Sequence, residues 1–380
     1  MGFWFDDISV EWKQHINLSE SAWIVILEDI KNFYSTEKEE TFSGFLNTIF
    51  KNFYQLSNAS ISFRLQEKED ELVKLYSSEE FAKIDGNLIS TIIDKQLTTY
   101  EEELKKTAKK YPLGHGEKFR INKENLDLLR ESQEDEYYDG TVGKYLKALF
   151  EEYAEKPIYI REQIFFKDTI DSIKTAIANQ RKIKIVLNDK VSVKGDITYN
   201  RKFYVSAYKI EQDSTKTYNY LIGYGRNVDN EDDIEVPCCF RVSRIKKINV
   251  QMSMGAKISK EKAKELDNLI LERTVMFMSS GPIDIEIRFT DKGLESFRRQ
   301  LYMRPRVYTI DKNDKHLYTF RCTEIQAINY FFKFGWDANI IKPVELREKI
   351  KDRYLKSFKT YDGMTKEEII ENDKKNNESN

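Results

Sequence analysis

The chain has 380 residues, of which 40% are hydrophobic and 33% are charged, and its formal net charge at pH 7 is −2. A chain of this size can bury several cores and is long enough for two or three domains. It contains no run of about 18 apolar residues and begins without the basic and apolar stretches of a signal peptide, so we expect a cytoplasmic protein with no membrane partner.

A repeated helical pattern marks the first part of the chain. Segments 41–54 and 141–154 carry apolar or aromatic residues at six matching positions, with the spacing of one helix face. Each copy begins with a threonine that can cap the helix, and each is preceded by another helix and a short alternating strand. The sequence therefore predicts two strand–helix–helix units. Their strands lie at 12–18 and 118–121.

The order of these units, and the stretch 15–21 in particular, resembles the ribbon-helix-helix family of DNA-binding proteins. In that family the outward side chains of the paired strands enter the major groove of DNA. Alternation places Ile16 and Leu18 inward. The resemblance implies a possible DNA-facing set of Lys13, His15, Asn17, Lys118 and Arg120. It leaves open whether both strands pair within one chain, and the alternative is a helical domain of ordinary amphipathic helices.

A strand-rich segment follows a helix predicted at 168–179. Four β-branched and aromatic runs are separated by Asn, Gly and Asp clusters, which predicts a small antiparallel barrel or sheet. These runs lie at 182–187, 201–210, 217–224 and 240–250. In residues 181–250, 14 Lys and Arg stand against 9 Asp and Glu, a net charge of +5, which leaves −7 for the rest of the chain. Such an excess suits a phosphate-binding surface.

These strands resemble the WYL domain in order and spacing. That family has an Sm-like β-barrel and is named for a Trp-Tyr-Leu triplet. Here Asn219 stands at the Trp position, Tyr220 and Leu221 match the triplet, and Ala207 stands where the family often has Pro. The departures weaken any inference about a stacking Trp but not the inference of the fold.

The WYL resemblance also implies a nucleic-acid or nucleotide site on one face of the barrel. Guanidinium groups bind phosphate bidentately, and tyrosine rings stack on unpaired bases. Arg241 and Arg244 are three residues apart, so in a regular strand they would face opposite sides, and the pair requires a bulge or a structural role for one of them. By position, the site residues are Arg201, Tyr208, Lys209, Tyr220, Arg241 and Arg244.

The C-terminal part resembles the extension that follows WYL domains. Its pattern predicts a strand at 283–289, helices at 292–301 and 323–332, and then a closing strand and a helix start at 336–346. Related WYL proteins are dimeric through this region, so the aromatic residues at 331–336 imply a homodimer; the alternative is that they pack the domain's own core.

The predicted organisation is therefore an α/β multidomain chain with four parts. These are a helical ribbon-helix-helix-like domain at 1–157, a WYL domain with its leading helix at 158–252, an α+β C-terminal extension at 253–365, and a disordered tail at 366–380. Together they resemble the WYL-domain accessory proteins of type VI-D CRISPR systems, which bind single-stranded RNA and stimulate an RNA-guided, RNA-cutting effector nuclease.

This resemblance implies single-stranded RNA, the effector nuclease and a second copy of the chain as partners. The alternative is a ligand-sensing transcriptional regulator of the WYL family, with the ribbon on operator DNA. An enzyme is not expected, because HExxH, GxSxG and Walker motifs are missing from the sequence. Three scattered histidines and three cysteines without CxxC spacing predict neither a metal nor a cofactor.

Overall fold

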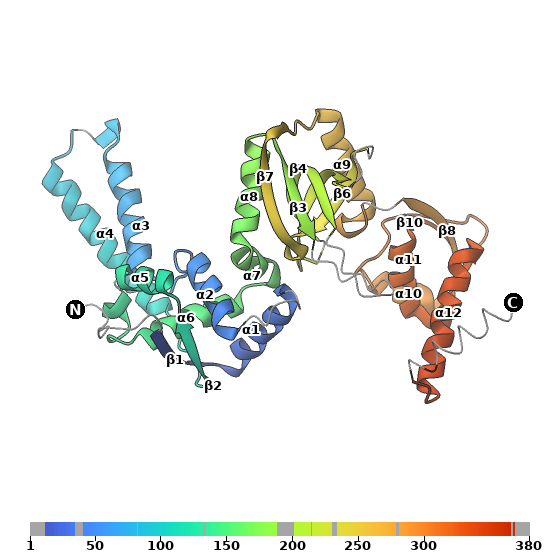
Figure 1. The fold of residues 1–380 in the computed structure, drawn as a ribbon, viewed down its shortest axis with the longest axis horizontal. Coiled ribbons are helices and arrows are strands. Elements are labelled where there is room, and N and C mark those ends of the chain that lie inside the picture. The colour runs from blue at the N-terminus through green and yellow to red at the C-terminus, as the bar shows by residue number, and fades with distance from the viewer. Residues whose placement is uncertain are drawn as a thin grey trace.

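The structure is a computed structural model that describes residues 12–34, 41–81, 83–132, 134–187, 201–213, 215–229, 234–278, 281–365 and 368. Over these ranges the chain has twelve α-helices and eleven strands, and the strands form three sheets. The chain is therefore a mixed α/β protein. Figure 1 shows three parts along the long axis, each with one of the sheets. The predicted disordered tail lies, apart from residue 368, outside the described residues.

The first sheet is a two-stranded ribbon formed within one chain. Strand β1 (Trp12–Leu18) pairs antiparallel with β2 (His115–Ile121), so that Trp12 lies opposite Ile121 and Leu18 opposite His115. Two helices follow each strand, as the repeat predicts. They are α1 (Glu20–Phe33) and α2 (Phe42–Phe53) after β1, and α5 (Lys123–Glu131) and α6 (Val142–Glu155) after β2.

Local capping explains where most of these helices begin. The side chains of Ser19, Thr41 and Asn122 each accept a hydrogen bond from a backbone N–H three residues later. Thr141 makes no such bond, and its hydroxyl donates instead to the carbonyl of Asp139. Thr141 therefore occupies the predicted N-cap position, but its side chain makes no capping hydrogen bond.

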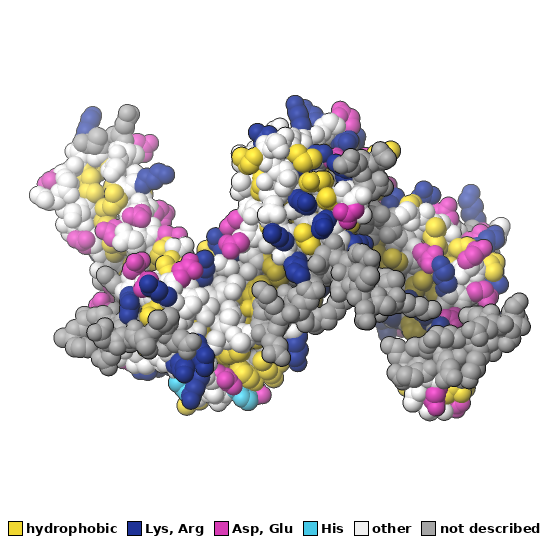
Figure 2. Space-filling model, viewed as in Figure 1, with side chains coloured by type: hydrophobic (Ala, Val, Ile, Leu, Met, Phe, Trp, Pro, Cys, Tyr) yellow, Lys and Arg dark blue, Asp and Glu magenta, His cyan; other side chains and the backbone are white. Residues whose placement is uncertain are grey.

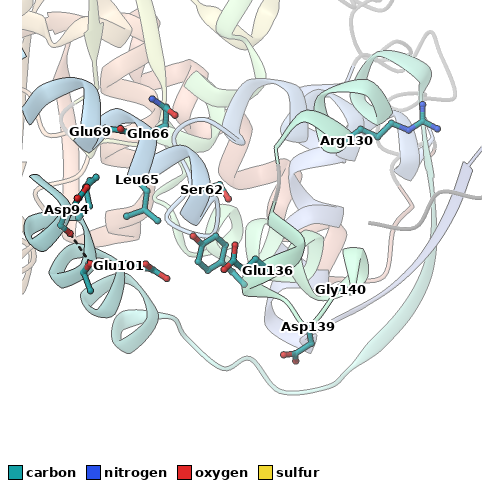
Figure 3. Close-up of a pocket in the computed structure, with 13 residues that line it drawn as sticks. Ser62, Leu65, Gln66, Glu69, Asp94, Glu101, Arg130, Glu136, Asp139 and Gly140 are labelled. Atoms are coloured by element: carbon teal, nitrogen blue, oxygen red, sulfur yellow. Dashed lines mark hydrogen bonds between the residues drawn. The ribbon is translucent and has the colours of Figure 1, made fainter. Parts of the chain in front are cut away.

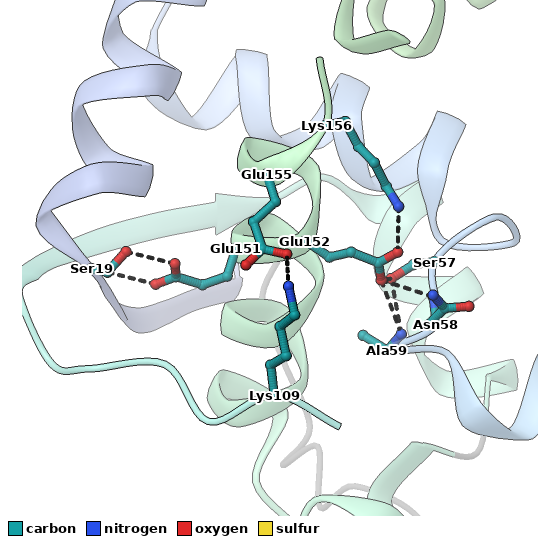
Figure 4. A network of polar contacts seen from close by, with 9 residues as sticks. All are labelled: Ser19, Ser57, Asn58, Ala59, Lys109, Glu151, Glu152, Glu155 and Lys156. Carbon is teal, nitrogen blue, oxygen red and sulfur yellow. Dashed lines mark hydrogen bonds and ion pairs between the residues drawn. The ribbon is translucent and has the colours of Figure 1, made fainter. Parts of the chain in front are cut away.

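The core of this part lies between the ribbon and the repeated helices. The inward residues Ile16, Leu18 and Phe119 are almost fully buried against the helices. Helix α6 also fixes the ribbon's end, because Oε1 and Oε2 of Glu151 accept from the backbone N and Oγ of Ser19 at 2.5 and 2.6 Å (Figure 4). The ribbon is thereby held in a defined position on its helical base.

A helical hairpin between the two repeats projects from this part. Its helices α3 (Ile61–Tyr76) and α4 (Gly86–Thr107) pack on each other and stand away from the other helices (Figure 1).

Among the described helices, none has the length and apolar character needed to cross a membrane.

Helices α7 (Ile158–Phe165) and α8 (Lys167–Ala178) lead into the second sheet. Its five strands are antiparallel in the order β6-β5-β4-β3-β7. They are β3 (Arg181–Leu187), β4 (Lys202–Gln212), β5 (Asn219–Asn227), β6 (Val236–Arg241) and β7 (Ile245–Gly255).

The connection between β6 and β7 shows that this sheet is curled. The two strands lie at opposite edges of the sheet, yet only the one-turn 3₁₀ helix η3 (Val242–Arg244) joins them. Four residue steps span at most about 14 Å, whereas the edges of a flat five-stranded sheet lie about 19 Å apart. No pairing of β6 with β7 closes the sheet over the described residues, so a closed Sm-like barrel is not confirmed.

The same connection corrects one predicted strand. The run 240–250 is not a single strand, because η3 interrupts it after Arg241. The β-branched and aromatic composition of the run predicts extended backbone but contains no signal for a single 3₁₀ turn.

The third sheet has the strand order β11-β8-β10-β9 and follows helix α9 (Lys260–Arg273). Its strands are β8 (Pro282–Phe289), β9 (Val307–Ile310), β10 (Leu317–Thr323) and β11 (Ala338–Lys342). Three helices pack with it: α10 (Asp291–Arg299), α11 (Glu324–Phe331) and α12 (Val344–Tyr361). Phe331 and Phe334 are buried in this core, whereas Trp336 is 89% exposed. The aromatic segment thus mostly packs its own domain.

Candidate nucleic-acid interface

A cavity of about 460 Å³ opens beside η3, between the curled sheet and the segment that follows α10. Three arginines and three tyrosines contribute to its wall, and Tyr302 comes from the C-terminal part of the chain. The six residues are Arg201, Arg241, Arg244, Tyr218, Tyr220 and Tyr302. Four of the six site residues predicted for the WYL domain thus line one cavity.

The 3₁₀ turn resolves the spacing of Arg241 and Arg244. Side chains three residues apart eclipse one another in a 3₁₀ helix, whereas they point to opposite faces of a strand. Arg241 is the residue before η3 and Arg244 is its last residue. Both can therefore face the same cavity, which a regular strand would not allow.

Arg241 is held between a ring and a carboxylate. Its Cζ lies 3.1 Å from the centroid of the Tyr218 ring, and its Nε lies 3.7 Å from Oε1 of Glu162. A guanidinium stacked on an aromatic ring keeps its in-plane N–H groups available for an anion. The pair with Glu162 limits the directions in which this side chain can turn, so Arg241 is pre-oriented at the cavity wall.

Glu162 extends from α7 into the sheet and is fully buried. Its Oε2 accepts from the backbone N and from Nδ2 of Asn219 at 2.6 and 2.8 Å, and its Oε1 accepts from the backbone N of Ser243 at 3.2 Å. Burial raises the pKa of the Glu162 carboxyl, and these hydrogen bonds and Arg241 oppose that rise. The carboxylate thus ties α7, β5 and η3 together beneath the cavity.

Asn219 is the sheet residue that binds Glu162 and α7. This side chain is fully buried, and its Nδ2 donates to the carbonyl of Tyr159 at 2.8 Å as well as to Glu162. Its Oδ1 accepts from Gln163 at 2.9 Å. A tryptophan at this position would keep the backbone donor but would lose the Nδ2 donor to the buried Glu162. The polar residue therefore joins the sheet to α7.

Helix α7 contacts the parts on both sides of it. Arg161 donates from Nε and Nη2 to the buried Asp29 of α1, at 2.6 and 3.0 Å, while the adjacent Glu162 binds the sheet. Sequence reasoning missed both residues, because their partners are more than fifty positions away and only the fold brings them together.

Tyr218 and Tyr220 form the aromatic wall of the cavity. The carboxylate of Asp213 accepts from the backbone N of Thr217 at 2.5 Å and of Tyr218 at 3.4 Å, which shapes the turn before β5. Tyr220 lies opposite Arg241 in the sheet, and burial raises the pKa of its hydroxyl, which stays protonated at neutral pH. Asp213 also lines the cavity, but its carboxylate is hydrogen-bonded to these backbone N–H groups.

The structure does not bring Tyr208 and Lys209 into this cavity. The Tyr208 hydroxyl donates to Asp267 of α9 at 3.0 Å. Lys209 forms ion pairs with Asp267 at 3.0 Å and Glu211 at 2.9 Å. A shift of register between Ala207 and Lys209 interrupts the alternation of β4 at this point. These two predicted site residues therefore hold α9 against the sheet.

The ribbon presents a second basic surface. Its outward face pairs Lys13 with Arg120 and His15 with Lys118 across the strands. Like charges directly opposite one another destabilise a strand pair. Figure 2 shows Lys and Arg side chains gathered beside a His at this edge of the molecule. Asn17 also lies on this face but is half-buried, and its Oδ1 accepts from the backbone N of Gly114 at 2.7 Å.

A groove in the first part of the chain has the opposite charge. A groove of about 1170 Å³ lies between the α3–α4 hairpin and the residues after α5 (Figure 3). Five carboxylates and one arginine line it: Glu69, Asp94, Glu101, Glu136, Asp139 and Arg130. Such a field repels a polyanion, so this groove is not a candidate for nucleic acid.

The fold and the site together define a three-part α/β protein with a recessed basic and aromatic cavity and a basic ribbon. No family model matches the sequence, and no curated protein matches it. Among solved structures, the chain is similar to one described as a CRISPR Cas-related protein, with 22% identity, a TM-score of 0.71, and coverage of 95% of this chain and 98% of the other. The two share their fold from end to end.

A second solved structure is proteasome accessory factor B/C (PafBC) of Arthrobacter aurescens. It has 12% identity and a TM-score of 0.26, and the match covers 88% of this chain and 48% of that one. A score this low supports no argument about fold or function.

Proposed function

We propose that this protein is an accessory protein of a CRISPR system that binds single-stranded RNA in the cavity beside η3. The observation that carries the proposal is the cavity itself, where Arg201, Arg241 and Arg244 meet the rings of Tyr218, Tyr220 and Tyr302. The end-to-end similarity in fold to a CRISPR Cas-related protein supports the biological setting.

The chemistry of the cavity favours a single strand over a duplex. Guanidinium groups bind phosphate oxygens, and an unpaired base can enter a recessed cavity and stack on a ring, with about 1–3 kcal/mol per stacked base. The bases of a duplex are already stacked inside the helix, and extruding one costs a few kcal/mol. Three phosphate contacts to a single strand would give a slope of log K against log salt of about −2.

The resemblance to type VI-D accessory proteins extends this proposal to a partner. RNA held at the cavity would be presented to an RNA-guided effector nuclease, which the protein stimulates without performing catalysis itself. A reconstituted cleavage assay tests this step. The purified protein should raise the rate of RNA cleavage by the effector, and a cavity variant that no longer binds RNA should not.

Direct binding measurements test the RNA site. The purified protein is titrated with single-stranded RNA, single-stranded DNA and duplex DNA of one sequence. We expect the tightest binding to RNA, and we expect the Arg201→Glu/Arg244→Glu variant to lose it. Equal affinity of the wild type and a folded cavity variant for RNA would overturn the proposal.

The ribbon supports a second candidate function, a DNA-binding regulator of the WYL type. The observation that favours it is the exposed basic face of the ribbon, where Lys13 lies opposite Arg120 and His15 opposite Lys118, because such a face suits the phosphates of a duplex. Selection of duplex sequences from a random library tests it. Enrichment of one sequence, lost in the Lys13→Ala/His15→Ala/Asn17→Ala variant, would support the regulator, and no enrichment would remove it.

We also propose that the protein forms a homodimer through its C-terminal part. Trp336, Phe358 and Tyr361 are highly exposed there, and large exposed aromatic residues are enriched at protein interfaces. Light scattering at micromolar concentration should give twice the mass of the chain, and Trp336→Ser/Phe358→Ser should give the monomer. A monomer mass for the wild type would contradict the proposal.

A further inference from the structure

The outer face of the five-stranded sheet carries a group of cations that the cavity does not include. Alternation along β3 and β4 turns Ile183, Ile185 and Val205 into the core. The residues that alternate with these core residues face outward, and so do the residues opposite them on the neighbouring strands. We name the outward set Lys184, Lys202, Tyr204, Arg226 and Lys247 the outer basic face.

Strand register places these residues in two adjacent rows. In the first row Tyr204 lies between Lys184 and Arg226. In the second, Val186 lies between Lys202 and Lys247. These six strand positions outside the core therefore hold four cations, one tyrosine ring and one valine. Figure 2 shows Lys and Arg side chains gathered over this part of the molecule.

Two of the cations flank the tyrosine ring. The Nζ of Lys184 and the Cζ of Arg226 lie 5.7 and 5.4 Å from the centroid of Tyr204. Glu235 is an acid near this face, and it forms its ion pair with Lys182 at 2.5 Å. Proteins that bind single-stranded nucleic acid combine cations, which contact the phosphates, with exposed aromatic rings, which stack on the bases.

The cavity and the outer basic face lie on opposite faces of the sheet and meet at the end of β3 and the start of β4. Leu187 and Arg201 both line the cavity. Lys184 precedes Leu187 by three residues on β3, about 10 Å along a strand, and Lys202 directly follows Arg201. Alternation turns Leu187 and Arg201 to the core face and Lys202 to the outer face, so an RNA strand that leaves the cavity past Arg201 passes around the start of β4 to meet Lys202 and then Tyr204.

We propose that the outer basic face is a second contact for the same single-stranded RNA, and that it binds the phosphates of the nucleotides that leave the cavity. This inference rests on the proposed RNA binding in the cavity. It adds a length requirement, because an RNA too short to reach beyond the cavity gains nothing from these cations. The two sites therefore differ in how they respond to RNA length.

The test compares RNAs of about 4 and about 16 nucleotides, the range of site sizes on small β folds. For Lys184→Glu/Lys202→Glu we expect unchanged affinity for the short RNA. For the long RNA we expect at least a tenfold loss of affinity and a salt slope that is flatter by about 1.4, since two phosphate contacts are removed. Arg201→Glu/Arg244→Glu should lose affinity for both the short and the long RNA.

A matched control separates contact from net charge. Lys292→Glu/Lys312→Glu makes the same change in charge on exposed residues of the C-terminal part. An equal loss in this control, or an unchanged affinity of folded Lys184→Glu/Lys202→Glu for the long RNA, would overturn the inference. Where that variant fails to fold, Lys184→Gln/Tyr204→Leu provides the same comparison of RNA lengths.

Two further outcomes distinguish this inference from the proposed RNA binding in the cavity, on which it rests. If the wild type binds neither RNA, RNA binding in the cavity fails and the second contact fails with it. If Lys184→Glu/Lys202→Glu binds both RNAs normally but no longer stimulates the effector nuclease, the outer basic face contacts the effector protein instead, and the RNA inference is overturned.

Discussion

The ribbon and the cavity both gather cations, and they support them in different ways. On the ribbon, Lys13 and Arg120 lie opposite each other on an exposed two-stranded face. In the cavity, Arg241 stacks on Tyr218 and pairs with the buried Glu162. The ribbon's cations are therefore exposed beside one another, whereas the cavity's central charge is held by a ring and a buried carboxylate.

This difference separates the ligands that the two surfaces suit. A narrow, exposed ribbon of cations can enter the major groove of a duplex, which admits a two-stranded β-ribbon. A recessed cavity with fixed arginines and rings fits an unpaired nucleotide. The difference also predicts that substitutions in the cavity can damage folding, while substitutions on the ribbon should change binding with little effect on folding.

The largest effect on folding is expected for Arg241→Glu. The change removes the cation beside a buried carboxylate and places a second carboxylate there, and breaking a buried ion pair costs on the order of 3–5 kcal/mol. Urea unfolding measures the loss. A variant as stable as the wild type would show that Glu162 does not depend on Arg241 and would weaken the contrast with the ribbon.

Arg201→Glu/Arg244→Glu is therefore the better test of RNA binding, since both residues are exposed at the cavity. We expect RNA affinity to fall at least about a hundredfold and the salt slope to flatten by about 1.4, because two phosphate contacts become repulsive. Circular dichroism and the melting temperature should stay close to those of the wild type. Filter binding at several salt concentrations provides the measurement.

The pH dependence of stability should depend on Glu162. Burial raises the pKa of its carboxyl, so the protonated form favours folding; this contribution is complete below the ordinary pKa of about 4.3 and is lost as the pH rises through the raised value. Glu162→Gln lacks this contribution. From pH 4 to pH 7 the wild type should lose stability relative to the variant, as urea unfolding at both pH values would show.

A control with the opposite sign is available at Glu261. A hydrogen bond with Ser259 lowers the pKa of that carboxyl, so its contribution is present at neutral pH and is lost as the pH falls. Relative to Glu261→Gln, the wild type should gain stability as the pH rises. If both variants changed in the same direction, burial of Glu162 would not be the cause.

The smallest expected effect is on the ribbon. Lys118→Ala removes a cation that has Lys13 as its diagonal neighbour across the strands and Arg120 two positions further along β2, and since like charges across a strand pair are unfavourable by roughly 0.2–1 kcal/mol, the melting temperature should rise slightly. Glu117→Ala, at a neighbouring position of β2, is the control. A lower melting temperature for Lys118→Ala would show that the ribbon's charges are stabilised by contacts within the fold.

The regular elements of the fold followed from local patterns. Alternation in 12–18 and 118–121 is enough to place Ile16, Leu18 and Phe119 in the core, because a strand has a period of two. Helix starts at Ser19 and Asn122 followed from residues that cap their own backbone. Such signals lie within a few positions of each other and can be read without the fold.

The parts that were missed depend on distant partners. Glu162 looks like a surface acid of an amphipathic helix until Asn219 and Ser243 are placed against it. Tyr208 and Lys209 look like site residues until Asp267 of α9 binds them. Helix α9 itself is so highly charged that its apolar face is weak in the sequence. The domain boundaries stay predictions, because α7 contacts the parts on both of its sides.

One measurement tests the central claim that RNA binds in the cavity and not on the ribbon. Single-stranded RNA is titrated into the wild type, Arg201→Glu/Arg244→Glu and Lys13→Ala/His15→Ala/Asn17→Ala under one salt condition. We predict that the cavity variant loses RNA binding while the ribbon variant keeps the wild-type affinity. A folded cavity variant that keeps its RNA affinity and salt slope, or a ribbon variant that loses them, would contradict the account.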